Sequence, residues 1–249
     1  MQPQQPVALT SLRDQIDQVD QQMHQLLNQR ARLAEQVAHA KQATETNPVF
    51  YRPEREAQVL HAVMARNTGP LADETVARLF REIMSACLAL EAPQTIAFLG
   101  PLGTFTQAAA LKHFGHSAVS VPQATIDEVF REVEAGSAHY GVVPVENSSE
   151  GVVNHTLDCF LASSLQVMGE VELRIHHNLL VAETTRKESI TRIYSHQQSL
   201  AQCRKWLDAH YPNAERVAVS SNAEAARAIK IAWPSAAIAG ESAAAQYGL

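Results

Sequence analysis

The sequence predicts two unlike parts, an all-α N-terminal domain followed by an α/β domain with two lobes. From Leu12 to about Ala43, apolar residues recur at alternating steps of four and three, the spacing of a long amphipathic helix. Beyond Glu91 the pattern changes to short apolar runs that alternate with helical segments, which is typical of a mainly parallel sheet. We therefore predict domains at residues 1–92 and 93–249.

Three helices account for the first part, at about 12–43, 53–66 and 73–91. One slot of the apolar series on the first helix holds Arg30 instead of an apolar residue. A helix of this length needs a partner along its apolar face, and two shorter helices cannot cover it. We therefore expect a homodimer, a helical bundle formed through the N-terminal helices of two copies.

The second part is expected to form lobes at about 95–175 and 176–249, the second of them incomplete. Expected strands lie at 95–99, 118–121, 140–145, 166–169, 172–182, 192–194 and 216–219. Expected helices lie at 107–114, 126–134, 154–161, 199–210 and 222–231. The alanine-rich stretch 223–245 is interpreted as helix.

Composition excludes several classes of protein. At 249 residues and 46% hydrophobic, the chain has room for two cores, and its net charge of −6 argues against a nucleic-acid surface. No apolar segment approaches the 18 or so residues of a membrane helix, and the N-terminus lacks a secretory pattern, so we expect a cytoplasmic protein. Cys87, Cys159 and Cys203 lack CxxC spacing, and no HxxxH occurs, so neither a disulfide framework, nor a metal site, nor a cofactor is predicted.

Arg30 is the most informative residue of the first part, because an unpaired charge on an apolar seam is costly to bury. Lys41 lies eleven residues after Arg30, so around the helix axis the two side chains point within roughly 20° of each other. One interpretation is a salt bridge from Arg30 to a carboxylate such as Glu56 or Glu91. The other is a cavity in which Arg30, Lys41 and Arg13 of a second copy hold a dianion.

In the second part, the apolar run 140–145 stops abruptly at Glu146, Asn147, Ser148 and Ser149. Polar side chains at the C-terminal end of a strand line the crevice where α/β sheets bind ligands. The alternative is a solvated turn without a ligand.

These residues amount to a family resemblance. The first part resembles the all-helical chorismate mutases in Leu12-Arg13-Asp-Gln-Ile16, Gln29-Arg30-Ala-Arg-Leu33, Ala40-Lys41, Tyr51-Arg-Pro-Glu-Arg-Glu56 and Leu79-Phe-Arg-Glu-Ile83. The second resembles the prephenate dehydratases in Gly100-Pro-Leu-Gly-Thr-Phe105, Pro144-Val-Glu-Asn-Ser-Ser-Glu-Gly151, Ser195-His-Gln-Gln-Ser-Leu-Ala-Gln-Cys203 and Ala243-Ala-Ala-Gln-Tyr-Gly-Leu249. Together they follow the order of the bifunctional chorismate mutase/prephenate dehydratase family, whose second domain resembles periplasmic binding proteins.

For the first part, the resemblance implies rearrangement of chorismate to prephenate without a cofactor. Arg13 of the second copy and Arg30 would bind the two carboxylates, Lys41 would face the ether oxygen, and Glu56 would hold the ring hydroxyl. Arg52, Arg55 and Cys87 are further substrate-binding candidates.

Glu91 departs from the family pattern together with Cys87, because a Gln and a Ser are often found at these two positions. Glu91 could donate a hydrogen bond to the ether oxygen only when protonated, which requires a raised pKa such as burial supplies. Mutase turnover is then expected to fall as the pH rises through neutrality.

For the second part, the resemblance implies conversion of prephenate to phenylpyruvate by loss of carbon dioxide and hydroxide. Thr104, Glu146, Asn147, Ser148 and Ser149 would line one wall of a cleft between the lobes. Ser195, His196 and Gln202 would line the other wall. The alternative for His196 is a cap on the helix that follows it.

The sequence ends at Leu249, before the Thr-Arg-Phe motif and the regulatory domain of most such dehydratases. We therefore expect a fragment of a longer protein, or a chain with impaired dehydratase activity. Two other functions stay open at this point: a mutase joined to an inactive lobe pair, and a two-lobed protein that binds a small acid without chemistry.

Overall fold

The computed structural model describes residues 9–46, 48–147, 151–232 and 234–249. The chain divides into two compact units, Met1–Pro93 and Gln94–Leu249. The first is all-α and the second is α/β, which confirms the predicted fold class. None of the described helices is both long enough and apolar enough to cross a membrane.

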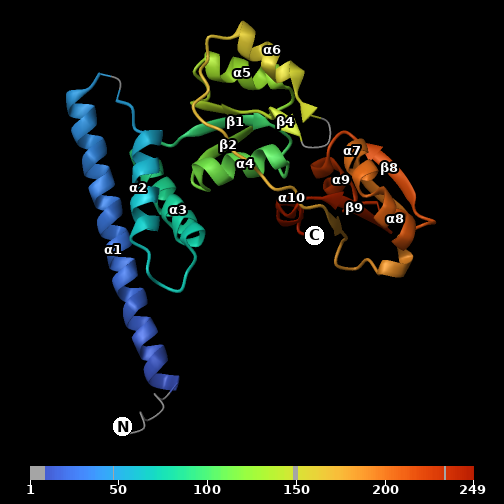
Figure 1. Cartoon of the computed structure of the whole chain (residues 1–249), viewed down its shortest axis with the longest axis horizontal. Coiled ribbons are helices and arrows are strands. Elements are labelled where there is room, and N and C mark those ends of the chain that lie inside the picture. The colour runs from blue at the N-terminus through green and yellow to red at the C-terminus, as the bar shows by residue number, and fades with distance from the viewer. Residues whose placement is uncertain (1–8, 47, 148–150, 233) are drawn as a thin grey trace. The chain divides into compact units, whose positions relative to one another are not determined.

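The first unit contains α1 (Leu9–Thr44), α2 (Pro53–Ala65) and α3 (Asp73–Glu91). All three predicted helices are present. Proline at the first position of α2 needs no hydrogen-bond acceptor there, and the acidic residues in the first turns of α2 and α3 complement the helix dipole. Figure 1 shows α2 and α3 beside the C-terminal part of α1, whose N-terminal turns extend beyond them.

The core of this unit is small and lies between the helices. Tyr51, Leu60, Val63 and Cys87 are buried, whereas Ala38 is the one buried residue of α1. The apolar seam of α1 stays exposed at Leu12, Ile16, Val19, Met23, Leu26, Leu33 and Val37. The α1 helix therefore presents to solvent the face that its sequence pattern marks for burial.

In the second unit, the first lobe is built on a parallel sheet of strand order β2-β1-β3. Its strands are β1 (Thr95–Leu99), β2 (Val119–Gln123) and β3 (Tyr140–Val142), and the central strand β1 buries Ile96, Ala97 and Phe98. The lobe also contains α4 (Phe105–Phe114), α5 (Ile126–Glu134), α6 (Asn154–Ala162) and a short antiparallel pair, β4 (Glu146–Asn147) with β5 (Gly151–Val152).

Reciprocal capping sets the starts of α4 and α5. The hydroxyl of Thr104 accepts a hydrogen bond from the Gln107 amide (3.3 Å), while the Gln107 side chain accepts one from the Gly103 amide (2.6 Å). The same arrangement recurs with Thr125 and Glu128 at α5. Each cap is a local sequence signal, which is why the predicted helix starts lie within two residues of the observed ones.

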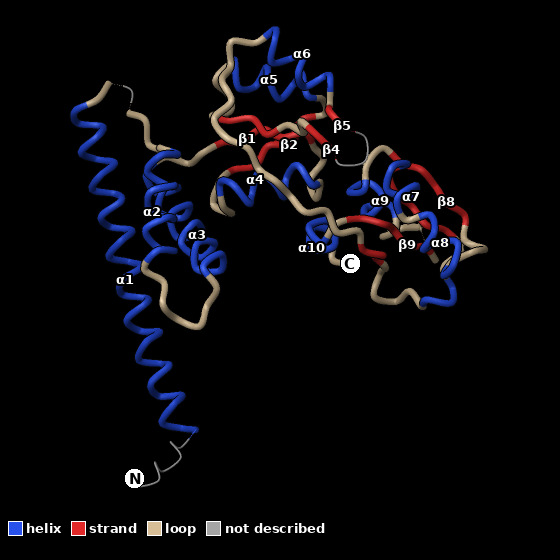
Figure 2. The backbone as a smooth tube through the Cα atoms, in the orientation of Figure 1, coloured by secondary structure: helices blue, strands red, loops and turns tan. Residues whose placement is uncertain are grey.

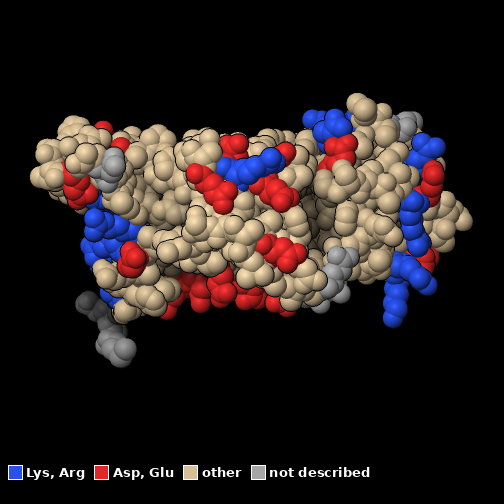
Figure 3. Space-filling view, turned by 90° about the horizontal axis from the view of Figure 1, so that it is seen from above, with Lys and Arg blue, Asp and Glu red and all other residues tan. Residues whose placement is uncertain are grey.

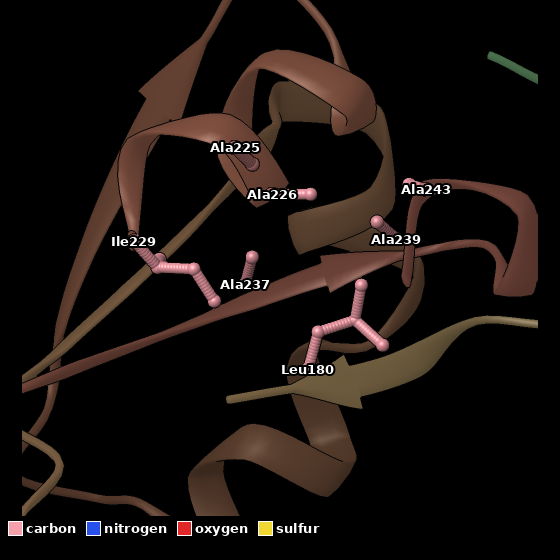
Figure 4. Close-up of a cluster of buried hydrophobic side chains, with 7 residues drawn as sticks. All are labelled: Leu180, Ala225, Ala226, Ile229, Ala237, Ala239 and Ala243. Atoms are coloured by element: carbon pink, nitrogen blue, oxygen red, sulfur yellow. The ribbon is translucent and has the colours of Figure 1, made fainter. Parts of the chain in front are cut away.

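The second lobe is built on a four-stranded sheet of order β6-β9-β7-β8. Its strands are β6 (Asn178–Leu180), β7 (Arg192–His196), β8 (Glu215–Val219) and β9 (Ser235–Ala239), and only β6 runs antiparallel to its neighbour. Helices α7 (Gln197–Gln202), α8 (Arg204–His210), α9 (Asn222–Ala228), α10 (Glu241–Tyr247) and the 3-10 turn η1 (Lys187–Ser189) complete the lobe. Small side chains from α9, β9 and α10 pack with Leu180 in one core cluster (Figure 4).

Four predictions for this unit were wrong in detail. Residues 163–177 contain no strand, and Figure 2 shows them as loop. The predicted strand 172–182 is limited to β6, because extended chain without a neighbouring ladder is not a strand. The predicted helix 199–210 is divided at Cys203 into α7 and α8. The alanine-rich stretch taken as helix contains β9, which is buried at every position.

Charged side chains do not form one continuous basic surface on the face shown in Figure 3, where acidic and basic groups are scattered among uncharged ones. This distribution agrees with the net charge of −6. An anionic ligand must therefore be bound by locally placed cations.

Candidate functional site

In the helical unit, Arg30 is half-buried on α1. Among the described residues it forms no salt bridge with Glu56 or Glu91, the two partners considered from the sequence. Glu56 instead accepts a hydrogen bond from Arg81 Nε at 3.0 Å, with only 17% of its side chain exposed. The salt-bridge interpretation of Arg30 is therefore not what the described residues show.

Glu91, the last residue of α3, has its pKa raised above the ordinary value by burial. Lys41 and Arg30 act in the opposite direction, because nearby positive charge favours the carboxylate. These three side chains are thus close enough to interact, and the cost of burial outweighs the attraction of the two cations. The structure therefore brings together two cations and a carboxyl group that resists ionisation.

Lys41 is held in place by the loop between α1 and α2. Its Nζ donates a hydrogen bond to the Val49 carbonyl at 3.0 Å and lies 5.3 Å from the centre of the Phe50 ring. An ammonium group has three protons to donate, so this anchoring leaves donor capacity for a ligand. The loop fixes the direction of the Lys41 side chain.

The other candidates of this unit are less enclosed. Arg13 is exposed on α1, and it lies 17 residues, or about 25 Å, from Arg30 along the helix. Arg52 is exposed just before α2, and Arg55 is exposed with a hydrogen bond to Gln58 at 3.4 Å. Cys87 is buried, with 5% of its surface exposed.

In the second lobe, Asn222 connects three residues of the predicted Ser195–Cys203 motif. Its Oδ1 accepts a hydrogen bond from the His196 amide (3.1 Å), and its Nδ2 donates to Ser199 Oγ (2.9 Å). Ser195 Oγ lies 2.8 Å from Asn222 Oδ1 and 2.7 Å from the Ile238 carbonyl, so its single proton can reach either acceptor. One amide side chain thereby fixes the junction between β7 and α7.

Ser195 was expected to line a substrate wall, but the structure places it in the interior with 0% of its surface exposed. Its hydroxyl hydrogen-bonds to Asn222 and to the Ile238 carbonyl within the lobe, so Ser195 stabilises the motif from the interior. The neighbouring residue, His196, is half-buried at the N-cap of α7. Its side chain makes no capping hydrogen bond there, and the capping alternative is therefore not what the structure shows.

Thr104 is likewise engaged with the fold. Besides capping α4, its hydroxyl donates a hydrogen bond to the Leu99 carbonyl at 3.2 Å, at the C-terminal end of β1. Glu146 and Asn147 form β4, where Glu146 is exposed and Asn147 is half-buried. Ser148 and Ser149, also predicted site residues, lie outside the described residues.

Gln202, at the end of α7, is paired with a histidine that sequence reasoning missed. His177 Nε2 lies 2.7 Å from Gln202 Oε1, and the His177 ring meets Phe105 edge to face with 6.1 Å between centroids. The other ring nitrogen, Nδ1, is buried without a hydrogen-bond partner among the described residues. A proton on Nε2 would be donated to Gln202 Oε1, and this contact orients the Gln202 amide.

The loop that carries Thr104 packs closely against α10 and the turn before it. A Cβ atom built on Gly240 would lie 2.6 Å from Phe105 Cε1, and one on Gly103 would lie 3.2 Å from Ala243 Cα. Tyr247 also donates a hydrogen bond to the Leu102 carbonyl at 3.3 Å. Glycines at these two positions permit the close approach.

Sequence reasoning missed Arg81, His177 and Asn222. Asn222 follows two serines and starts a helix, so its spacing looks like an ordinary helix start, and its long-range partners leave no local trace. His177 was placed in a strand pattern that the structure does not form. Arg81 was quoted only as part of a motif.

Comparisons with known proteins match the helical unit and the α/β unit to two different families. Residues 12–92 match the family model for chorismate mutase type II, and residues 96–249 match the one for prephenate dehydratase. The chain is 65% identical to the bifunctional chorismate mutase/prephenate dehydratase of Stutzerimonas stutzeri, over 97% of this chain and 67% of that protein. The corresponding protein of Pseudomonas aeruginosa is 64% identical with the same coverage.

Among solved structures, the prephenate dehydratase of Arthrobacter aurescens in complex with L-Phe is similar, with 36% identity and a TM-score of 0.51. The match covers 61% of this chain and 52% of that one.

Replacing Asn222 by alanine is expected to lower the free energy of unfolding by about 1–3 kcal/mol, because buried polar groups at Ser195 and Ser199 lose their partner. Urea denaturation of the purified chain measures this change. Asn213→Ala, at an exposed position in the same lobe, is the matched control and is expected to leave the free energy of unfolding unchanged. Equal free energies of unfolding for the two variants would show that the hydrogen bonds of Asn222 do not stabilise the lobe.

Proposed function

The chain belongs to the family of bifunctional chorismate mutases/prephenate dehydratases, and we propose that it rearranges chorismate to prephenate and then converts prephenate to phenylpyruvate. The substrates are small organic acids, and these steps belong to phenylalanine biosynthesis. Location in the cytoplasm stays a prediction from the sequence.

The single observation that carries the first activity is the group of Arg30, Lys41 and Glu91. Chorismate is a dianion, and its rearrangement breaks an ether bond while a carbon–carbon bond forms. Negative charge grows on the ether oxygen as that bond lengthens, so positive charge and donated hydrogen bonds held in place lower the barrier. The reaction needs no nucleophile, and conformational restraint of the substrate supplies the remainder.

Roles for these side chains follow from their charge. Arg30 would bind one substrate carboxylate and Lys41 would face the ether oxygen. Glu91, whose pKa is raised by burial, would donate a second hydrogen bond to that oxygen when it is protonated. Glu56, oriented by Arg81, would accept a hydrogen bond from the ring hydroxyl. Arg52, Arg55 and Cys87 remain weaker candidates for substrate contact.

The second activity removes carbon dioxide and hydroxide from prephenate, and formation of an aromatic ring drives it. The enzyme has to orient the carboxylate and supply a proton to the departing hydroxyl. We propose that His196, Gln202, Asn147 and Glu146 face the substrate. Thr104 and Ser195, whose hydroxyls are engaged within the lobes, would position the loops that carry the contacting groups.

Two alternatives considered from the sequence are less well supported. A mutase joined to an inactive lobe pair leaves the match to prephenate dehydratase unexplained, and a binding protein without chemistry leaves both family matches unexplained. Family models for both activities match successive parts of this chain, and its relatives at 64–65% identity carry both names.

We further propose that two copies associate through α1. The exposed seam of α1 includes Ile16, Met23 and Leu26, exposed by 59%, 55% and 63%. In an antiparallel pair whose two-fold axis lies midway between positions 13 and 30, Arg13 of the partner subunit stands level with Arg30. The offset of about 25 Å along the helix axis that separates these residues in one copy is thereby removed, which leaves only the lateral separation of the two helices. Each dimer would then contain two complete cationic sites.

Arg30→Ala is expected to slow chorismate consumption by about 10²–10³-fold, because the fixed positive charge that binds and positions one substrate carboxylate is lost. Conversion of added prephenate to phenylpyruvate should be unchanged. Both rates are measured on the purified chain by following chorismate, prephenate and phenylpyruvate. Arg32→Ala, at an exposed position on α1, is the matched control. Normal mutase activity in Arg30→Ala would remove the basis of the first activity.

The pH profile of the mutase tests Glu91. Because its pKa is raised and the protonated form is the donor, activity should fall as the pH rises through that pKa. Glu91→Gln keeps a donor at every pH and should flatten this limb of the profile. Glu74→Gln, at the exposed start of α3, should keep the wild-type profile. If the descending limb persists in Glu91→Gln, another group titrates.

Met23→Asp is expected to dissociate the dimer, because it places a charge in the centre of the apolar seam. Analytical ultracentrifugation measures the mass, and loss of mutase activity should accompany dissociation because Arg13 is then withdrawn. Gln21→Asp adds the same charge at another exposed position of α1 and should leave the mass unchanged. A wild-type chain that sediments as a monomer contradicts the proposal.

A further inference from the structure

Three side chains of metal-ligating type gather between α5 and α6, and none of them is assigned to either reaction. Asp127 lies in the first turn of α5, while His155 and Cys159 are four residues apart on α6. One ligand atom from each lies within 4.8 Å of the others. His155 Nε2 is 2.8 Å from Asp127 Oδ2, and Cys159 Sγ is 3.8 Å from Asp127 Oδ1 and 3.9 Å from His155 Nε2.

The two helices that carry this cluster are fixed against each other. Phe130 of α5 and Phe160 of α6 meet edge to face with 5.0 Å between ring centroids. Ser163, just beyond α6, donates a hydrogen bond to Glu134 at the end of α5. Residues at i and i+4 share one face of a helix, so His155 and Cys159 both point towards Asp127. Figure 1 shows α5 and α6 adjacent in the first lobe.

A nucleophilic cysteine does not explain the arrangement. In a Cys-His-Asp relay the acid holds one ring nitrogen and the thiol faces the other. Here the same atom, His155 Nε2, lies nearest both Asp127 and Cys159.

Convergence of three different donors on one point is instead the arrangement of a metal site. Tetrahedral zinc has bonds of about 2.0 Å to nitrogen or oxygen and about 2.3 Å to sulfur, so its ligand atoms stand about 3.3–3.6 Å apart. The observed separations of 2.8, 3.8 and 3.9 Å bracket these values, so binding would require only a change of less than about 1 Å in each distance.

The donor set also selects the class of metal. One sulfur, one imidazole nitrogen and a single carboxylate suit Zn²⁺ and similar transition-metal ions, whereas Mg²⁺ and Ca²⁺ need several oxygen ligands. The charges of one carboxylate and one thiolate balance a divalent cation. We propose that Asp127, His155 and Cys159 bind one divalent ion of the Zn²⁺ class, with water as the fourth ligand.

A hydrogen bond beside the proposed metal site connects α6 to the segment that carries the proposed dehydratase residues Glu146 and Asn147. Thr156, between the two α6 ligands, is fully buried, and its hydroxyl donates a hydrogen bond to the Pro144 carbonyl at 2.7 Å. Pro144 precedes Glu146 and Asn147 by only a few residues. An ion that ties α6 to α5 therefore also restrains the anchor of this segment.

Cobalt(II) provides a direct test, because a bound thiolate gives it a charge-transfer band in the near ultraviolet and histidine alone does not. Titration of the full 249-residue chain should give this band with one-to-one saturation, and Zn²⁺ should abolish it by displacing the cobalt. Cys159→Ser should lose the band. His155→Gln and Asp127→Asn should each weaken cobalt binding by at least about tenfold.

Cys203→Ser is the matched control, since Cys203 is another partly exposed cysteine of the same unit, and it should keep the band. Circular dichroism of each variant checks that it is folded. Absence of the band at stoichiometric cobalt, its survival in Cys159→Ser, or its loss in Cys203→Ser would overturn the proposal. Unaltered cobalt affinity in both His155→Gln and Asp127→Asn would overturn it as well.

Discussion

An imbalance of charge between α1 and α3 is the constraint on which the helical unit depends. Arg30 and Lys41 carry two positive charges, and the carboxyl group that interacts with both, Glu91, is held towards its neutral form by burial. Glu56, the other acid considered as a partner, is taken by Arg81. Partial burial of unneutralised cations is unfavourable in a free protein, and an entering dianion removes that cost. This charge imbalance is what supports the proposal that the unit binds a dianion.

In the α/β unit, several side chains that the sequence suggests as ligand contacts instead form hydrogen bonds within their own lobe. Ser195 and Thr104 direct their hydroxyls at carbonyls of their own lobes, and Asn222 holds the turn that displays His196. Gln202 is oriented by His177 rather than left to rotate. Contacting residues supported by a second layer of hydrogen bonds keep their geometry before a substrate arrives. A polar motif can therefore contain residues proposed to contact the substrate and residues that only hold the fold in place.

Features that depend on neighbouring residues in the sequence could be predicted, whereas features that depend on contacts between distant residues could not. Helices with strong periodicity or capping pairs, such as α3 and α5, were predicted with the observed bounds. The β9 strand was missed because its residues, Ser235–Ala239, are buried at every position and show no alternation, and four of the five are small. The inward position of Ser195 and the partners of Asn222 depend on contacts between residues 23–43 positions apart, which spacing cannot report.

The length of α1 has a consequence for its dynamics. Residues 9–29 are all exposed, so in a single copy those turns gain little from packing and rely mainly on the hydrogen bonds of the helix itself. A peptide segment of that size is only marginally helical in water. Its amide protons would then exchange quickly in dilute solution and slowly at high protein concentration, whereas those of β1 and β9 would be insensitive to dilution. In the proposed dimer, local order in α1 would depend on the association of two copies as well as on the sequence of one chain.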